Sequence, residues 1–337
     1  MKVTNKILDC ILARYSELVG VPIKEGTFPG PQPVAVEKRH LPVLKNNEYV
    51  VCEKSDGERK LLLILYINEK PMCFVLDRNN EYRFIELSFK QELFEGCIFD
   101  CELVTQSGGS DNEFEFLVIH DCFAYNGVNF TNKPHSMRYH CITDFIDNRY
   151  KYKNSDPFKI KTKTFYQYGN RLPETYSLIR KMATNEIDGL IFTPVNSPVV
   201  FGRMNDLFKW KEINTIDFMV TKEANKLKLY YLDKNNKKKV YVSFQDGDEN
   251  YKLIDSFIKT NELTDKISGV KISGVNKTKV TTTPGNLIIE FKYSLNTKIF
   301  TPYRIRSDKN EPNGEITLNN TMKNISESLS INDFVNH

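Results

Sequence analysis

The seven residues Glu53-Lys54-Ser55-Asp56-Gly57-Glu58-Arg59 are the most informative stretch of this chain. They lie between two apolar segments, 48–54 and 60–67, whose composition is typical of β-strands. Asp-Gly is a strong turn former, so the stretch predicts a tight turn with Lys54 at the end of a strand. Lys-x-Asp-Gly also occurs by chance, and taken alone it is most simply an ordinary charged turn.

Further groups of charged residues lie at the ends of other predicted strands. They are Leu76-Asp77-Arg78-Asn79, Phe99-Asp100-Cys101-Glu102-Leu103, Glu186-Ile187-Asp188-Gly189-Leu190-Ile191-Phe192, Leu207-Phe208-Lys209-Trp210-Lys211 and Arg304-Ile305-Arg306-Ser307-Asp308-Lys309. Strand alternation puts Lys209 and Lys211 on the same side of their strand. Each group alone is typical of a solvated strand edge. Together they supply one lysine, several further cations and several carboxylates, which is the set that nucleoside triphosphate chemistry requires.

Hydrophobic periodicity predicts an α+β fold. Apolar residues repeat with helical spacing over 4–19, where Thr4 can cap the start and Gly20 the end, and helices are also predicted near 135–149, 173–183 and 315–335. A proline-rich loop is expected over 28–33. Strands are predicted at 48–54, 60–67, 72–77, 82–87, 97–104, 115–123, 187–193, 206–210, 216–222, 227–232, 238–244, 286–293 and 298–305. A change in character near 213–216 predicts a larger domain over 1–214 and a smaller β-barrel-like domain over 215–337.

Composition excludes several classes of protein. Hydrophobic residues make up 40% of the chain, which is enough for a packed core. The 47 basic and 43 acidic residues give a net charge of only +4, which permits a local basic cleft without proving one. Seven cysteines without paired spacing indicate reduced thiols inside a cell and no zinc site. The longest apolar run, 61–67, is far shorter than the ~20 residues of a membrane helix, and no signal peptide is expected.

The order of the charged blocks resembles the covalent nucleotidyltransferase superfamily, which contains ATP-dependent DNA ligases, RNA ligases and mRNA capping enzymes. The blocks are Lys54-x-Asp56-Gly57-x-Arg59, Asp77-Arg78, Asp100-x-Glu102-Leu103, Asp188-Gly189-Leu190-Ile191, Lys209-Trp210-Lys211 and Arg306-x-Asp308-Lys309. Thr215-Ile216-Asp217-Phe218 behind the fifth block and Pro312-Asn313 after the sixth are most similar to capping guanylyltransferases, especially the small single-activity enzymes of large DNA viruses. The resemblance spans about residues 28–335. It implies a ligase-type, ATP-grasp-like domain with antiparallel sheets, followed by an OB-fold domain.

The resemblance implies an enzyme that transfers GMP from GTP, through a phosphoramidate on Lys54, to the 5′-diphosphate end of RNA. A free lysine has a pKa of about 10.4, so this nucleophile needs cations or burial around it. The expected catalytic residues are Lys54, Lys209, Lys211 and Arg59. The expected GTP-binding residues are Arg78, Glu102, His120, Lys163, Asp188, Arg306, Asp308 and Lys309. Glu102 and Asp188 are also the expected ligands of Mg²⁺ or Mn²⁺, since hard cations prefer oxygen.

Several of these roles have a specific basis in the family pattern. His120, before Asp121, stands where the family places an aromatic ring on the purine, and Lys163 stands where a family lysine reaches the guanine oxygen. Arg306 and Lys309 are expected to contact the β- and γ-phosphates when the second domain closes. Cys101 takes the place of a glycine that is usual in the third block.

Two alternatives stay open at this stage: an ATP-dependent polynucleotide ligase with the same lysine chemistry, and a non-catalytic RNA-binding scaffold that kept the fold. No His-Cys-x5-Arg loop or glycine-rich methyltransferase loop occurs, so RNA triphosphatase and cap methyltransferase are expected as separate partners, with RNA polymerase as a further one. The balanced charge predicts weak, salt-sensitive RNA binding. The expected location is the nucleus, or the cytoplasm or virion for a viral protein.

Overall fold

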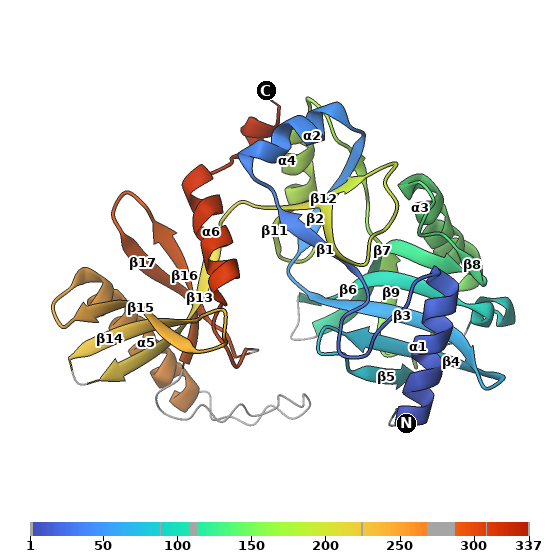
Figure 1. The fold of residues 1–337 in the computed structure, drawn as a ribbon, viewed down its shortest axis with the longest axis horizontal. Coiled ribbons are helices and arrows are strands. Elements are labelled where there is room, and N and C mark those ends of the chain that lie inside the picture. Colours follow the sequence, from blue (N-terminus) through green and yellow to red (C-terminus); the bar gives the residue numbers. More distant parts are fainter. Residues whose placement is uncertain are drawn as a thin grey trace. The chain divides into compact units, whose positions relative to one another are not determined.

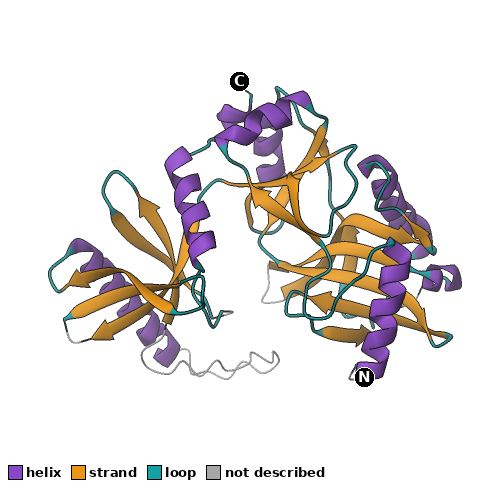
Figure 2. Ribbon diagram, viewed as in Figure 1, coloured by secondary structure: helices purple, strands orange, loops and turns teal. Residues whose placement is uncertain are grey.

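The computed structural model describes residues 3–87, 89–107, 113–223, 225–267, 287–307 and 309–335. The chain divides into two compact units, one containing Met1–Glu212 with Ser330–His337 and the other containing Ile213–Leu329. Both units are built mainly from strands, with helices packed against them (Figures 1 and 2). Within the described ranges, no helix combines the length and apolar character needed to cross a bilayer.

The larger sheet of the first unit has the strand order β5-β4-β3-β6-β7-β8, with β9 paired to β7. The strands are β3 Glu58–Ile67, β4 Lys70–Asp77, β5 Tyr82–Ile85, β6 Cys97–Ser107, β7 Glu113–Tyr125, β8 Val128–Asn129 and β9 Lys159–Thr162. Both faces are covered. Leu61 and Leu63 of β3 pack toward helix α1 (Asn5–Val19), and Leu62 packs in the cluster that includes helix α3 (His135–Asp144). Burial on both faces explains why β3 is apolar without alternation.

The second sheet of this unit has the order β1-β12-β11-β2-β10. Its strands are β1 Pro31–Ala35, β12 Gly202–Lys211, β11 Ile187–Pro194, β2 Tyr49–Ser55 and β10 Tyr166–Gln167. The predicted loop over 28–33 is therefore partly wrong, because Pro31 begins a strand parallel to β12. Proline is tolerated there because β1 is an edge strand, where a missing N–H need not break the ladder. Helices α2 (Leu41–Asn46) and α4 (Leu172–Met182) and the 3₁₀ turns η1 (Lys38–His40) and η2 (Gln91–Glu95) also belong to this unit.

The second unit is built on one antiparallel sheet of order β15-β14-β13-β16-β17. The strands are β13 Thr215–Glu223, β14 Lys226–Leu232, β15 Lys238–Gln245, β16 Leu287–Ser294 and β17 Ile299–Ile305. Helices α5 (Glu249–Ile267) and α6 (Glu315–Glu327) accompany it, and Phe218, Phe291 and Phe300 lie in its core. The five-stranded sheet agrees with the predicted OB-fold domain, and the α+β fold class is confirmed. Helix α5 was not predicted.

Helix ends follow local chemistry in most places. Helix α1 ends at Gly20, whose φ of 73° is left-handed, as the sequence predicts. The predicted helix over 135–149 is α3 followed by a π-helical turn, η3 (Phe145–Arg149). The predicted helix over 315–335 is too long, because Ser328 turns the chain with a φ of 46° and a separate 3₁₀ turn, η4 (Ile331–Phe334), follows.

Residues 330–335 pack in the first unit, whereas the sequence assigns the whole of 215–337 to the second domain. The Phe334 ring stacks on Phe192 with the centroids 5.1 Å apart and meets Trp210 edge-on at 5.8 Å. The Tyr168 hydroxyl donates a 2.8 Å hydrogen bond to the Phe334 carbonyl. These aromatic contacts explain why residues 330–335 pack in the first unit although they follow the second unit in the chain.

Candidate active site

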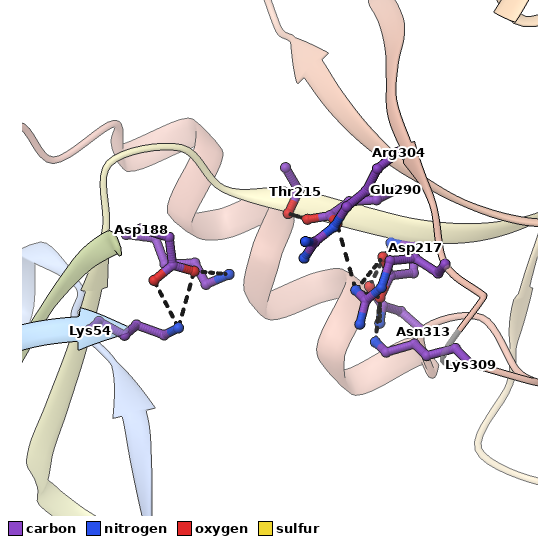
Figure 3. A network of polar contacts seen from close by, with 10 residues as sticks. Lys54, Asp188, Thr215, Asp217, Glu290, Arg304, Lys309 and Asn313 are labelled. Atoms are coloured by element: carbon purple, nitrogen blue, oxygen red, sulfur yellow. Dashed lines mark hydrogen bonds and ion pairs between the residues drawn. The ribbon is translucent and has the colours of Figure 1, made fainter. Parts of the chain in front are cut away.

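Lys54 lies in β2 just before the tight turn that leads into β3, as the sequence predicts. In the ladder between β2 and β11, Lys54 pairs with Gly189, and Ile187 pairs with Ser55. Asp188 is therefore the extra residue of a β-bulge, and such a bulge re-aims a side chain. Its carboxylate meets the Lys54 amine, with Nζ 2.8 Å from Oδ1 and 3.0 Å from Oδ2 (Figure 3).

The neighbouring strand β12 supplies two more amines. Lys211 pairs in register with Gly189, and its Nζ lies 2.8 Å from Asp188 Oδ2. The approach of the two strands depends on Gly189, since a Cβ there would lie 1.9 Å from the Trp210 carbonyl oxygen. Lys209, two residues before Lys211, points to the same side. One carboxylate thus lies between the amines of two different strands.

The charges in this cluster shift the titration of its members. Burial, then the nearby charges of Lys54, Lys211 and Arg78, lower the pKa of Lys209 to about 8. Burial alone would raise the pKa of Asp188, but the charges of Lys54 and Lys211 and their hydrogen bonds outweigh it and lower that pKa. Asp188 is therefore ionised at neutral pH, and Lys209 loses its proton far more readily than an ordinary lysine. The structure brings together Lys54, Lys209, Lys211 and Asp188 as expected.

Arg59 is occupied by other partners. Its guanidinium makes a two-pronged pair with Asp100, in which Nε donates to Oδ1 at 2.8 Å and Nη2 donates to Oδ2. Its Nη1 donates to the Pro31 carbonyl at 2.6 Å, and the guanidinium lies over the Phe28 ring. Both members of the pair are buried, with side chains 8% and 1% exposed. This geometry favours a structural role for Arg59, and its predicted catalytic role stays a prediction.

Glu102 and Arg78 lie close to the same charges. Burial raises the pKa of Glu102, while Lys163 and Lys54 act in the opposite direction. Glu102 also lies against the turn that follows Lys54, since a Cβ on Gly57 would come within 2.9 Å of its Cγ. Burial, then the charge of Arg59, lowers the pKa of Arg78. The two residues are near the nucleophile, and their predicted contacts with ribose and metal stay predictions.

His120 and Lys163 also lie in the first unit near these groups. His120 Nε2 is 3.4 Å from Asp100 Oδ1, and burial lowers the pKa of His120 to about 4, so the ring is neutral at pH 7. The Lys163 amine is buried and donates to the Glu53 carbonyl at 2.8 Å and to Ser55 Oγ at 3.0 Å. Both partners of Lys163 flank the nucleophile in the first block.

In the second unit, the predicted phosphate-binding cations meet a buried carboxylate that the sequence analysis did not assign to the site. Asp217 accepts hydrogen bonds from Arg306 Nη1 at 3.2 Å and from Lys309 Nζ, and Asn313 Oδ1 accepts one from the Asp217 amide at 2.9 Å (Figure 3). Asp217 and Asn313 lie in the two short segments, 215–218 and 312–313, that support the resemblance to capping guanylyltransferases. The sequence therefore contained a signal for both residues. The predicted residue Asp308 lies outside the described residues.

Comparison with known protein families shows to which branch of the superfamily this chain belongs. The family profile "mRNA capping enzyme, catalytic domain" matches residues 8–213, and "mRNA capping enzyme, C-terminal domain" matches residues 213–335. The chain belongs to the mRNA capping enzyme family. The two matched regions meet at the residue where the second compact unit begins.

Individual relatives agree with the family match. The chain is 33% identical over 256 residues to the mRNA-capping enzyme subunit alpha of Saccharomyces cerevisiae, covering 68% of this chain and 55% of that protein. It is 33% identical over 235 residues to the subunit of that name from Candida glabrata, covering 61% and 52%. The mRNA-capping enzyme of Caenorhabditis elegans is 30% identical over 219 residues, covering 59% and 34%. The chain spans about half the length of the fungal relatives.

Solved structures similar to this capping-family chain include two ligases. The mycobacterial DNA ligase D complexed with ATP and MES matches with a TM-score of 0.47 at 12% identity, over 85% of this chain and 97% of that one. The ATP-dependent DNA ligase from bacteriophage T7 in complex with ATP matches with a TM-score of 0.39 at 12% identity, over 82% and 98%.

The two carboxylates predicted to bind a divalent ion, Glu102 and Asp188, both lie near Lys54, whose charge acts to lower the pKa of each. No group of three or more His, Cys, Asp or Glu side chains gathers anywhere in the described ranges. Mg²⁺ is typically held by one or two carboxylates together with substrate phosphates and waters, which matches the two predicted ligands Glu102 and Asp188. An ion bound there would neutralise phosphate charge during attack on phosphorus.

Proposed function

We propose that this member of the capping enzyme family is a guanylyltransferase, which transfers GMP from GTP to the 5′-diphosphate end of RNA by way of Lys54. The observation that supports the proposal is the shared carboxylate of Asp188. It contacts the amines of Lys54 on β2 and Lys211 on β12, with Lys209 beside them. An amine nucleophile is thus held in one place beside cations that can bind the phosphate it attacks.

In the first half-reaction, the Lys54 amine gives up its proton and attacks the α-phosphorus of GTP. A nitrogen–phosphorus bond forms, and the bond from the α-phosphorus to the bridging oxygen breaks. Pyrophosphate leaves with that electron pair. Asp188 accepts a hydrogen bond from Nζ at 3.0 Å and orients the amine, and because its own pKa is lowered, the proton passes to solvent. Lys209 and Lys211 stabilise the charge on the non-bridging oxygens, which is where such catalysis gains most.

In the second half-reaction, an oxygen of the RNA 5′-diphosphate attacks the phosphorus of the lysine–GMP adduct. The nitrogen–phosphorus bond breaks, the nitrogen keeps the electron pair and takes up a proton, and capped RNA leaves. The same cations serve both steps because the charge develops at the same phosphorus. Asp188 then holds the regenerated amine in position for the next GTP.

Base choice rests on His120 and Lys163 in this proposal. Neutral imidazole can lie against a purine face, and the low pKa of His120 keeps it neutral. The buried Lys163 amine is a donor suited to the O6 oxygen of guanine, and adenine offers a donor at that position instead. The roles of Arg306 and Lys309 toward the distal phosphates stay predictions.

The names of the relatives support part of the expected set of partner proteins. Several fungal relatives are named subunit alpha of a capping enzyme, which supports the expectation that RNA triphosphatase acts on a separate chain. The divalent ion, the methyltransferase and polymerase partners, and the cellular location stay predictions.

The test is adduct formation with α-labelled GTP or ATP and Mg²⁺, followed by a denaturing gel. A labelled band is expected with GTP and not with ATP, and it should disappear in Lys54→Ala. Lys54→Arg should also be inactive, because a guanidinium does not deprotonate. Lys45→Ala, which removes an exposed lysine of α2, is the matched control and should label normally. Labelling with ATP alone would favour the ligase alternative, and no labelling with either would favour the scaffold.

A further inference from the structure

The second unit contains a loop that no step described above uses. The described strands β13, β14, β15, β16 and β17 are, in this order, the first to the fifth strand of the OB-fold. In OB-folds, the loop between the fourth and fifth strands is one of the parts that contact oligonucleotides. In this chain that loop is 295–298, between β16 and β17. The side chains beside it are therefore candidates for a binding surface.

The two faces of β16 differ in what covers them. Phe291 belongs to the core cluster of this unit, together with Tyr251 of α5 and Leu318 of α6. Glu290 and Lys292 are the neighbours of Phe291 in β16, so they point to the opposite face. Both described helices of this unit therefore pack on the core face. Neither of them covers the face of Lys292, which we call the outer face.

Strand β17 places a tyrosine on this outer face. Arg304 and Pro302 pair with two consecutive residues of β16, so Tyr303 between them is the extra residue of a β-bulge. Such a bulge re-aims a side chain. Tyr303 is 52% exposed, and the Lys292 amine lies 4.1 Å from the centroid of its ring. The ring and the amine thus form one exposed pair next to the loop.

The carboxylates on the outer face already have cationic partners. The pairs are Glu290 with Arg304, and Asp217 with Arg306 and Lys309 (Figure 3). Lys292, in contrast, forms no ion pair with any residue that the structure describes, and its amine meets the Tyr303 ring instead. Its charge is therefore available to an anionic ligand.

The pairing of a ring with an amine indicates what kind of anion fits. One nucleotide supplies a base for an aromatic ring and a phosphate for an amine, and proteins that bind single strands combine these two contacts. Thr301 pairs in register with Lys292, so its exposed hydroxyl group lies on the same face and adds a hydrogen-bonding group. The outer face beside the loop thus has the features of a single-strand binding surface.

We propose that Tyr303 and Lys292 bind the acceptor RNA, with one base stacked on the Tyr303 ring and a neighbouring phosphate at the Lys292 amine. The inference rests on the proposed function, which makes RNA the acceptor, and adds a contact in the second unit. Because the 5′ end reacts at Lys54 in the first unit, the nucleotides bound here lie further along the strand. Stacking does not read base identity, so the contact is tolerant of sequence.

The first test measures binding without reaction, by fluorescence anisotropy with a labelled 5′-hydroxyl RNA of about 12 nucleotides, a usual site size for an OB-fold. Tyr303→Leu should weaken binding at least about fivefold, because it removes a stacked base. Tyr303→Phe keeps the ring and should stay within about twofold of wild type. The matched control is Tyr152→Leu, which removes an exposed tyrosine that also lies beside a lysine, in the first unit. It should bind as wild type does.

Abasic RNA isolates the stacking contact. When the same strand carries no bases, wild type and Tyr303→Leu should bind it equally weakly. Salt dependence isolates the phosphate contact, since each contact to a single strand contributes a slope of about −0.7 in log affinity against log salt. Lys292→Gln should therefore make the slope less negative by about 0.7. Lys252→Gln loses the same charge from an exposed position of α5 and should leave the slope unchanged.

The second test measures transfer. Protein loaded with labelled GMP and freed from GTP is mixed with increasing amounts of a 5′-diphosphate RNA of the same length. Tyr303→Leu should need at least about fivefold more RNA than wild type for half-maximal transfer. The GTP concentration that it needs for adduct formation should stay equal to that of wild type.

The outcomes distinguish this proposal from the proposed function. Equal binding by Tyr303→Leu and Tyr152→Leu, or an equal loss with normal and abasic RNA, overturns the stacking contact, and an unchanged salt slope in Lys292→Gln overturns the phosphate contact. A change confined to the GTP step overturns the acceptor surface. A wild-type protein that binds RNA through Tyr303 but forms no adduct with GTP contradicts the proposed function alone. If Tyr303→Leu does not fold, RNA with 4-thiouridine should still crosslink to wild type within 299–305, and crosslinks only elsewhere overturn the proposal.

Discussion

Arg59→Met is the substitution that best separates structure from catalysis at this site. The sequence analysis assigns Arg59 to the catalytic cations, but the structure gives all of its described donors to Asp100 and the Pro31 carbonyl. Methionine keeps much of the side-chain length and its contact with Phe28 while removing the charge. Asp100 would then be left in a buried position, 1% exposed, with His120 Nε2 at 3.4 Å as a remaining polar neighbour.

The expected cost follows from this burial. Removing one member of a buried ion pair typically costs about 3–5 kcal/mol, because the remaining charge is uncompensated. Replacing both members by apolar residues of similar volume is often nearly neutral. Arg59→Met alone should therefore lower the free energy of unfolding of the first unit by about 3–5 kcal/mol. Arg59→Met/Asp100→Leu should recover most of this loss, giving a favourable coupling of about 2 kcal/mol or more.

The assay can be restricted to the first unit. The chain has a single tryptophan, Trp210, which lies in β12 of that unit. Its fluorescence during urea unfolding therefore reports this unit without interference from the other one. Wild type, both single variants and the double variant complete the cycle, and adduct formation is measured in parallel at low temperature, where the variants are mostly folded.

Two results would refute the reasoning. A loss below about 1 kcal/mol for Arg59→Met would show that the pair is not a buried structural contact. If the double variant loses as much free energy of unfolding as the two single variants lose together, the two charges do not interact with each other. If Arg59→Met is folded but forms no GMP adduct, the catalytic role predicted from the sequence is correct.

Two further predictions concern the lysine cluster. Because the pKa of Lys209 is lowered to about 8, this amine is about half protonated at pH 8, and bound phosphates should raise that pKa and draw in a proton. Calorimetry with a GTP analogue that has a methylene group between the α- and β-phosphorus should detect uptake of about half a proton at pH 8 and little at pH 6.5. Lys209→Met should abolish the uptake, and an unchanged value there would assign the proton to another group. Gly189→Ala should force β11 and β12 apart, since its Cβ would meet the Trp210 carbonyl, and should cost about 1–3 kcal/mol and most adduct formation. Gly169→Ala, with open space around it, is the control, and equal behaviour of the two variants in urea unfolding would contradict the steric account.

Local signals in the sequence predicted local structure well. The Asp56-Gly57 turn, the left-handed end of α1 at Gly20 and the buried strand β3 depend on neighbours within a few residues, and all are confirmed. Strand β1 was missed because its prolines indicate a loop, and only pairing with β12, more than 160 residues away, makes it a strand. Helix α5 was missed although Tyr251, Ile254 and Ile258 follow helical spacing, because polar residues interrupt the pattern.

The chemistry of the site was predictable in its residue types but not in its pairings. The blocks identified the lysines and Asp188, and the structure brings these together. That Asp188 reaches Lys54 depends on a bulge in β11, which no composition signal reveals. That Arg59 is held by Asp100 depends on strands β3 and β6 being neighbours, where Arg59 pairs in register with Glu102. The sequence could not show which of several carboxylates each cation would meet.

The position of residues 330–335 makes the second unit an insertion between two segments of the first. A protein truncated at residue 212 would lack the Phe334 ring, which packs against Phe192 and Trp210. The aromatic surface exposed in this way includes Trp210, which lies between Lys209 and Lys211 in the sequence. A fragment of residues 1–212 prepared by itself should therefore aggregate and be poorly soluble. Adding a synthetic peptide of the 330–335 sequence back to that fragment is a direct way to restore it.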